Sequence, residues 1–258
     1  MAELPDLTVY AEILSRRFKG KTLKDLDVKV SKKLNVSVKE LESALLGKKL
    51  TAVSRYGKSL HFEFAGDIVL QIHLMLRGEL VLLNKENPDP KYEILGFMFS
   101  GGEGFAVVDL LRQATPTLNP EEAKSPDALE ITLEDLTATL SKSRKMVKEV
   151  LMDQKKMRGI GNSYADEILW HARISPFSAA NAIPEKAVKK LFSSMDKVLK
   201  KAIEEIAKEN GDELHGELRD VMKIHGSRIE KSPGGAAVKS EKIGGRTSYY
   251  TEEQELYN

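Results

Sequence analysis

One stretch in the second half of the chain carries residue types that can bind phosphate, and it reads Gly159-Ile160-Gly161-Asn162 between two helix-like segments. Two glycines allow a backbone to approach another molecule closely, and asparagine is a favourable helix N-cap. The N–H groups at the start of a helix, together with the Asn162 amide, can hold a phosphate oxygen. A tight turn with a purely structural N-cap explains the same residues, so the stretch alone leaves both interpretations open.

Composition excludes several other kinds of chemistry. The chain has 258 residues and no cysteine, which excludes disulfides, thiolate nucleophiles and cysteine-bound metals. Its five histidines are scattered without a metal-binding spacing, so we expect no metal and no cofactor. The sequence shows neither an apolar run that could span a bilayer nor a signal peptide, which predicts no membrane partner and a cytoplasmic location.

Charge distribution is more informative than the net charge of +1, which is low for a nucleic-acid-binding protein. Seven basic residues lie from Lys142 to Arg158, against only Glu149 and Asp153. Solvated helix faces are the simpler explanation of this pattern, and a phosphate-binding surface is the alternative.

The hydrophobic pattern predicts an α+β chain. Residues 3–18 have helical spacing, whereas residues 48–108 alternate between apolar and polar in short runs, which predicts a β-sandwich or a small barrel. Prolines at positions 116, 120 and 126 mark the end of this region. The remainder predicts helices, including a long amphipathic one after position 184, and a final hairpin over 242–250.

The segment around the glycines is similar to the helix-two-turns-helix motif of the formamidopyrimidine-DNA glycosylase and endonuclease VIII family. It reads Asp-Gln-Lys-Lys-Met-Arg-Gly-Ile-Gly-Asn-Ser-Tyr-Ala-Asp-Glu-Ile-Leu over residues 153–169. The resemblance implies that Lys155 and Asn162 contact DNA phosphates. It also implies an N-terminal helix with a two-sheet β-sandwich domain, a helix-two-turns-helix domain and a zincless β-hairpin finger, which we place at 1–125, 126–223 and 224–258.

The chain start resembles the same family. Met1-Ala2-Glu3-Leu4-Pro5-Asp6 is similar to the family's Pro-Glu-Leu-Pro-Glu opening once the initiator methionine is removed. The family's terminal amine attacks the sugar C1′ and forms a Schiff base, and here that amine is the primary amine of Ala2. The ordinary pKa of an α-amino group is about 7.7–8.0, so a neutral fraction exists near pH 7. The resemblance assigns Glu3 as general acid or proton shuttle and makes Asp6 the shorter counterpart of a second glutamate, although a helix dipole also favours acids in a first turn.

Two further matches lie in the region of predicted strands. Lys58 resembles the family's lysine on a hairpin turn, which contacts the phosphate at the lesion, and we group it with the catalytic residues. His73 matches a DNA-contacting histidine, and Leu76 stands where a methionine fills the gap left by the flipped base. Turn lysines and strand histidines are also common without any function.

The chief departure from the family lies in Asp109-Leu110-Leu111-Arg112-Gln113. Leu111 replaces the arginine that pairs with the orphaned base, and Gln113 replaces the phenylalanine wedge. Flipping a nucleotide costs a few kcal/mol of unstacking and pairing. We therefore expect weak action on duplex lesions and better action on single-stranded or distorted DNA, with Leu76 or Leu111 as an apolar plug.

The last predicted hairpin resembles the family's zinc finger, and Arg246 matches the arginine that grips the phosphates around the lesion. All four zinc cysteines are missing. Some family members build this hairpin without metal, so the resemblance implies a zincless finger in which Arg246 keeps its role.

Together the matches predict a DNA repair glycosylase with AP lyase activity on oxidised or ring-opened bases or abasic sites. We expect a monomer whose partner is damaged duplex, single-stranded or abasic DNA in the bacterial nucleoid. The alternative is a non-catalytic or lyase-only protein that binds lesions or abasic sites, favoured by Ala2, Asp6, Leu111 and Gln113. A third interpretation, a protein or RNA interaction module, is favoured by the near-neutral charge.

Overall fold

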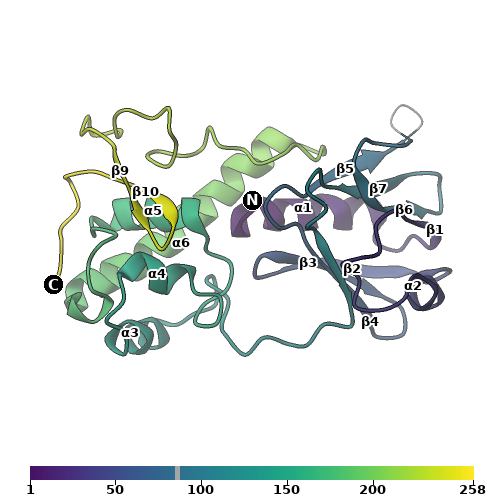
Figure 1. Cartoon of the computed structure of the whole chain (residues 1–258), viewed down its shortest axis with the longest axis horizontal. Helices are drawn as coiled ribbons and strands as arrows, with labels where there is room; N and C mark the ends of the chain where they lie inside the picture. Colours follow the sequence, from purple (N-terminus) through teal and green to yellow (C-terminus); the bar gives the residue numbers. More distant parts are fainter. Residues whose placement is uncertain (85–87) are drawn as a thin grey trace. The chain divides into compact units, whose positions relative to one another are not determined.

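The computed structural model describes residues 1–84 and 88–258, and its elements form two compact units (Figure 1). We call them the sandwich unit and the helical unit. The sandwich unit comprises Met1–Ala2, Asp6–Glu122 and Ile206–Leu218, and the helical unit comprises Glu3–Pro5, Ala123–Glu205 and Arg219–Asn258.

The sandwich unit contains two four-stranded antiparallel sheets, as the alternating sequence pattern predicts. The first has the strand order β1-β6-β7-β5, with β1 (Leu23–Val28), β5 (Glu79–Leu83), β6 (Glu93–Phe99) and β7 (Gly104–Val108). The second has the order β2-β3-β4-β8, with β2 (Leu50–Tyr56), β3 (Ser59–Phe64), β4 (Ile68–His73) and β8 (Thr115–Leu118). The helices α1 (Leu4–Phe18) and α2 (Val38–Leu45) precede most of these strands.

Aromatic side chains join the two sheets. Phe62 of β3 stacks against Phe97 of β6 and Phe105 of β7, with ring centroids 6.1 and 5.1 Å apart. Phe18, at the end of α1, stacks on Phe99 at 4.9 Å. Aromatic pairs of this kind bury large apolar areas and contribute strongly to a core. The structure therefore confirms a β-sandwich and not a small barrel.

The helical unit contains the remaining elements, which are α3 (Leu133–Ser141), α4 (Val147–Met152), α5 (Asn162–Ala172), a 3₁₀ turn η1 (Ala180–Ala182), α6 (Glu185–Asn210, its last turn in the sandwich unit), β9 (Lys239–Ile243) and β10 (Arg246–Tyr250). The long helix and the hairpin match the predictions. Gly244 and Gly245 both have positive φ, at 54° and 78°, as a two-residue hairpin turn requires. Among the described residues, no helix combines the length and the apolar character needed to cross a membrane.

Candidate functional site

Within the helical unit, the carboxylate of Glu3 binds the backbone N–H groups at the N-terminus of α5. Its Oε2 accepts hydrogen bonds from the N–H groups of Gly161 at 2.7 Å and Tyr164 at 3.3 Å, and its Oε1 accepts from Ser163 at 2.9 Å. Glu3 is only 2% exposed. The first N–H groups of a helix have no partner within the helix, and the helix dipole favours an anion there. Three donors therefore hold Glu3 in one orientation.

Two interpretations of this turn from the sequence are wrong. Asn162 is not the N-cap, because Gly161 is the cap and Asn162 is the first residue of α5. The N–H groups of Gly161, Ser163 and Tyr164, which one of the two open interpretations offered to a phosphate, are bound by Glu3, which lies 158 residues from Gly161 in the sequence. The Asn162 amide Nδ2 donates to the carbonyl of Thr247 at 2.9 Å. An amide nitrogen carries two N–H groups, so a phosphate can still accept from the second.

The turn that precedes α5 is shaped by Gly159 and Gln154. Gly159 has a φ of 106°, and a Cβ there would lie 2.7 Å from Leu4 Cδ1, so only glycine fits. Gln154 donates to the carbonyls of Met152 and Ile160 and accepts from the N–H of Gly159. Sequence reasoning did not single out Gln154, because a glutamine in a polar turn gives no signal of its own. Lys155 is exposed on this fixed turn.

Ala2 and Asp6 are buried in the sandwich unit. With Met1 present, the terminal ammonium is that of Met1 and forms an ion pair with Glu217. The Ala2 nitrogen is then a peptide nitrogen, which is not nucleophilic. A reactive Ala2 amine therefore requires the removal of Met1, and this amine is one residue away from Glu3 in the chain.

Lys58 and His73 lie close enough in the sandwich unit to interact electrostatically. Lys58 follows Gly57 in the two-residue turn that joins β2 and β3, where Gly57 has a φ of 60°. Burial lowers the pKa of His73, and the positive charge of Lys58 lowers it further. Nδ1 of His73 accepts from the N–H of Met75 at 2.9 Å, so a neutral ring carries its proton on Nε2. This nitrogen can donate a hydrogen bond.

The three residues predicted to fill or wedge the DNA helix are all exposed. Leu76 is 56% exposed and Leu111 is 47% exposed, in loops after β4 and β7, and Gln113 is exposed as well. The buried carboxylate of Asp109 accepts from the N–H groups of Leu111 at 2.8 Å, Gln113 at 2.6 Å and Ala114 at 2.9 Å. One side chain therefore fixes the loop backbone while Leu111 remains in solvent.

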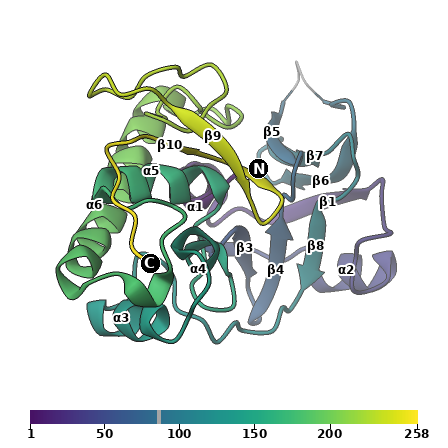
Figure 2. The same ribbon diagram turned by 60° about the vertical axis from the view of Figure 1, so that its left-hand side comes forward.

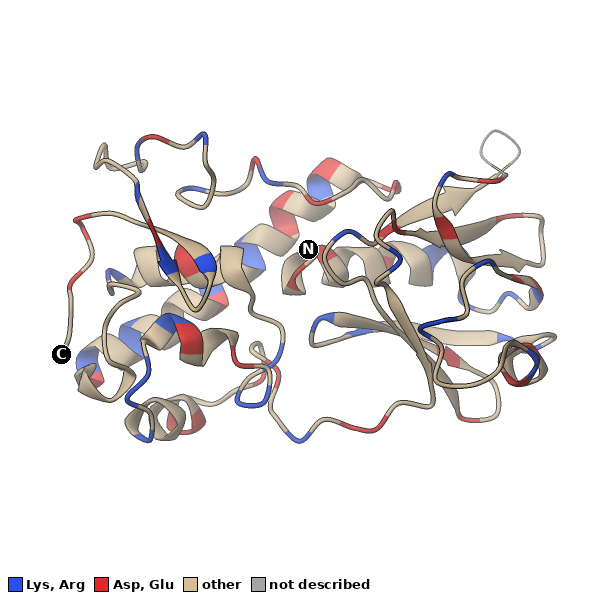
Figure 3. Ribbon diagram, in the orientation of Figure 1, with Lys and Arg blue, Asp and Glu red and all other residues tan. Residues whose placement is uncertain are grey.

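The basic segment of residues 142–158 is not uniformly on the surface. Lys148 is fully buried, so neither a solvated helix face nor a phosphate-binding surface accounts for this residue. Arg246 is exposed on β10. Figure 3 shows Lys and Arg on the hairpin, where β9 also carries Glu241, and on α6, where they alternate with Asp and Glu. The positive charge of α6 is thus largely balanced by its own acids.

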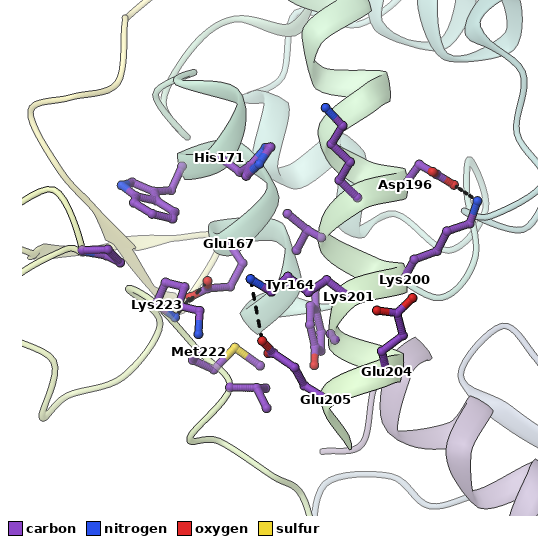
Figure 4. A pocket seen from close by; sticks show the side chains of 16 residues that line it. Tyr164, Glu167, His171, Asp196, Lys200, Lys201, Glu204, Glu205, Met222 and Lys223 are labelled. Atoms are coloured by element: carbon purple, nitrogen blue, oxygen red, sulfur yellow. Dashed lines mark hydrogen bonds and ion pairs between the residues drawn. The ribbon is translucent and has the colours of Figure 1, made fainter. Parts of the chain in front are cut away.

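A pocket of about 780 Å³ lies between α5, α6 and the segment around Met222 (Figure 4). Its lining includes Glu167, whose carboxylate accepts from the N–H groups of Lys223, Ile224 and His225. Burial raises the pKa of Glu167, and these three donors oppose that rise. None of the predicted site residues lines this pocket, and Glu167 holds the segment that follows α6.

The chain matches two family models, which cover residues 1–115 as "Formamidopyrimidine-DNA glycosylase N-terminal domain" and residues 123–223 as "Formamidopyrimidine-DNA glycosylase H2TH domain". The formamidopyrimidine-DNA glycosylase of Carboxydothermus hydrogenoformans is 30% identical over 268 residues, covering 97% of this chain and 98% of that protein. The enzyme of the same name from Lactobacillus gasseri is 29% identical over 283 residues, covering both chains completely.

Solved structures of proteins with this name are similar to this chain. Lactococcus lactis Fpg in complex with abasic-site DNA has a TM-score of 0.88 at 25% identity, covering 98% of this chain and 100% of that chain. The complex of a mutant of that protein with DNA containing Fapy-dG gives the same values.

Proposed function

Because the chain belongs to the formamidopyrimidine-DNA glycosylase family, we propose that it is a DNA repair glycosylase with AP lyase activity, which removes damaged bases and acts on abasic sites. One observation supports the catalytic assignment above all. Glu3 is a buried carboxylate fixed by the N-terminus of α5, and it directly follows the residue whose amine is proposed to react.

The proposed reaction begins with the neutral amine of Ala2 after Met1 has been removed. Its nitrogen attacks C1′ of the damaged nucleotide, and the glycosidic bond breaks with its electron pair leaving on the base, which takes up a proton from water. The Glu3 carboxylate takes up the proton that the attacking nitrogen loses and delivers it to the ring oxygen, so that the sugar ring opens as the Schiff base forms. At an abasic site the amine condenses with the aldehyde and releases water. A primary amine lacks the ring that orients a proline, so we expect a slower reaction.

Four side chains are proposed to hold the DNA backbone. Lys58 on its hairpin turn, Lys155 on the turn before α5, Arg246 on β10 and the second N–H of Asn162 each offer a donor suited to a phosphate. His73 is proposed to add a neutral donor through Nε2. Asp6 is a buried acidic residue, and the proposed reaction assigns no step to it.

The substrate preference follows from the exposed loops. Leu76 and Leu111 offer apolar side chains that can occupy the space of an extruded base, but neither can pair with the base left opposite. Gln113 has no aromatic face to stack on a base pair. We therefore propose that single-stranded, bubble or already distorted DNA is the better substrate.

Further assignments belong to the same proposal. The domain boundaries are 1–125, 126–223 and 224–258, and the protein acts as a monomer on nucleoid DNA in the cytoplasm. Its named relatives come from bacteria. Light scattering of the purified protein with and without an oligonucleotide checks the monomer, and limited proteolysis checks the boundaries.

A second candidate function keeps the DNA contacts but not base excision. Ala2 in place of proline, together with Leu111 and Gln113 in the loop, favours a protein that binds lesions or abasic sites or acts only as a lyase. Such a protein still clamps phosphates through Lys155 and Arg246. It does not release a damaged base.

Borohydride trapping separates the two candidates, because borohydride reduces a Schiff base to a stable covalent adduct. Protein lacking Met1, checked by mass spectrometry, is incubated with single-stranded and duplex oligonucleotides that carry an abasic site or a formamidopyrimidine. We expect an adduct that disappears when Met1 is retained or in Glu3→Gln, and persists in Glu12→Gln, a control on the exposed face of α1. An adduct with abasic DNA alone indicates a lyase, and no adduct despite tight binding rejects the enzyme.

A further inference from the structure

The finger hairpin of this chain does not fit the zinc ion of the family finger that it resembles. The hairpin β9–β10 contains no cysteine or histidine. Among residues 1–84 and 88–258, no group of three or more His, Cys, Asp or Glu side chains is arranged to hold a metal ion. A two-stranded hairpin is at best marginally stable in water by itself, so some other feature must hold this one in place.

A buried ion pair lies against β10. Nζ of Lys148, on α4, is 2.6 Å from Oδ1 of Asp166 on α5, and both side chains have zero exposure. The same Nζ donates to the hydroxyl of Ser248 on β10 at 2.7 Å. Burying two charges costs several kcal/mol per ion unless their hydrogen bonds are satisfied, so a pair in this position calls for a function beyond stability.

The other oxygen of Asp166 also binds the hairpin. Oδ2 accepts from the N–H of Tyr249 at 2.9 Å and from Nδ1 of His225 at 2.7 Å, and the His225 ring meets the Tyr249 ring edge-on at 4.9 Å. Asn162 binds the carbonyl of Thr247. Three consecutive residues of β10 are therefore attached to helices α4 and α5 (Figure 2).

The network also lies within electrostatic range of the proposed reaction site. Burial lowers the pKa of Lys148, while the negative charges of Asp166 and Glu3 raise it and the positive charge of Arg246 lowers it. Lys148 is thus close enough to interact with the proposed proton shuttle and with the proposed phosphate-binding arginine. Arg246 is two residues before Ser248, so the bonds to β10 restrain its backbone directly.

We propose that Lys148 and Asp166, assisted by His225, replace the metal as the anchor of the finger hairpin and position Arg246 for DNA binding. They are positioning residues, since none of them is proposed to touch the substrate. The part that concerns Arg246 rests on the proposed function, whereas the anchoring of β10 does not.

The first test measures hydrogen exchange of the hairpin in a variant that remains folded. Removing one partner leaves a buried unpaired charge, but replacing both with apolar residues of similar volume is often neutral for stability. We therefore choose Lys148→Met/Asp166→Leu, with the single variant Ser248→Ala as a milder change. The matched control is Lys200→Met/Asp196→Leu, which removes an exposed ion pair of 2.7 Å on α6.

We expect peptides covering residues 239–250 to lose protection in Lys148→Met/Asp166→Leu and, more weakly, in Ser248→Ala. Peptides from α6 should keep theirs, and the control should match the wild type throughout. If the double variant unfolds, Ser248→Ala decides the outcome. Unchanged hairpin protection in the folded variants overturns the anchor.

The second test is a double-mutant cycle on binding to an oligonucleotide that carries a tetrahydrofuran abasic-site analogue. Arg246→Ala should weaken binding roughly tenfold, as expected for a charge-assisted contact, and should lower the salt dependence. In the Lys148→Met/Asp166→Leu background, Arg246→Ala should weaken binding by less than twofold. Additive effects refute the positioning role. If Arg246→Ala has no effect in the wild type, the proposed role of Arg246 is wrong. Hydrogen exchange still tests whether Lys148 and Asp166 anchor the hairpin.

Discussion

Replacing Glu3 with glutamine tests whether this carboxylate stabilises α5 in addition to its proposed part in catalysis. Glutamine has nearly the same shape, but one of its two terminal atoms is an N–H donor instead of an acceptor. Both oxygens of Glu3 face backbone donors, those of Gly161, Ser163 and Tyr164. Whichever way the amide is turned, at least one of these N–H groups loses its acceptor and meets another donor.

The expected loss of stability can be estimated from these contacts. A buried donor left without an acceptor costs about 1–3 kcal/mol, and a hydrogen bond to a charged group contributes about 1.5–3 kcal/mol. Loss of the negative charge at a helix N-terminus adds about 0.3–1 kcal/mol. The amide oxygen keeps one or two of the bonds, so we expect Glu3→Gln to lower the free energy of unfolding of the helical unit by about 2–4 kcal/mol.

Urea unfolding followed by tryptophan fluorescence measures this loss in the relevant unit. Trp170 is the only tryptophan of the chain, and it lies on α5 with its indole N–H bonded to Glu253 at 2.9 Å. Glu12→Gln, on the exposed face of α1, controls for the change in net charge. An unfolding midpoint of Glu3→Gln that equals that of Glu12→Gln would refute the reasoning, because the three hydrogen bonds would then contribute nothing.

Three further predictions concern binding, substrate and pH. Leu111→Arg combined with Gln113→Phe should raise kcat/KM on duplex relative to single-stranded lesions by about tenfold, since flipping costs a few kcal/mol, and an unchanged ratio contradicts the substrate proposal. Lys155→Ala should lower the slope of log K against log salt by about 0.9 on duplex DNA, as measured by fluorescence anisotropy, whereas an unaltered slope removes Lys155 from the clamp. In the folded protein the pKa of His73 lies below its ordinary value of about 6.5, so as pH falls the unfolded chain takes up this proton first. The free energy of unfolding of the sandwich unit should therefore decrease by up to about 1.4 kcal/mol for each pH unit below 6.5. Unfolding of His73→Gln followed by circular dichroism should lack this part of the loss, and an identical pH dependence in both proteins excludes it.

Local sequence patterns were sufficient for most of the fold. Alternation of apolar and polar residues marks β3, where Leu60, Phe62 and Phe64 face the core, and helical spacing marks α6. The two glycines before Arg246 marked the turn of the hairpin, because both must adopt positive φ. Each of these signals lies within a few residues of the structure that it predicts.

Two features that the sequence did not predict involve partners far apart in the chain. The N–H groups of α5 are bound by Glu3, and no pattern near Asn162 indicates that an acid from the chain start will occupy this position. Lys148 belongs to a run of basic residues typical of a solvated face, and only its contact with Asp166 shows that it is buried. A sequence states the charge of a side chain but not its burial, so the anchor of the hairpin could not be predicted.

The first residues of the chain belong to both units, and this constrains the order in which the protein can fold during synthesis. Glu3–Pro5 belong to the helical unit, while the residues on either side belong to the sandwich unit. Glu3 leaves the ribosome early, but its partners at Gly161 and beyond are added 158 residues later. At about 5–20 residues per second of synthesis, this delay is on the order of ten seconds. A nascent chain therefore cannot fix the Glu3 carboxylate at the N-terminus of α5 until most of the protein has been made.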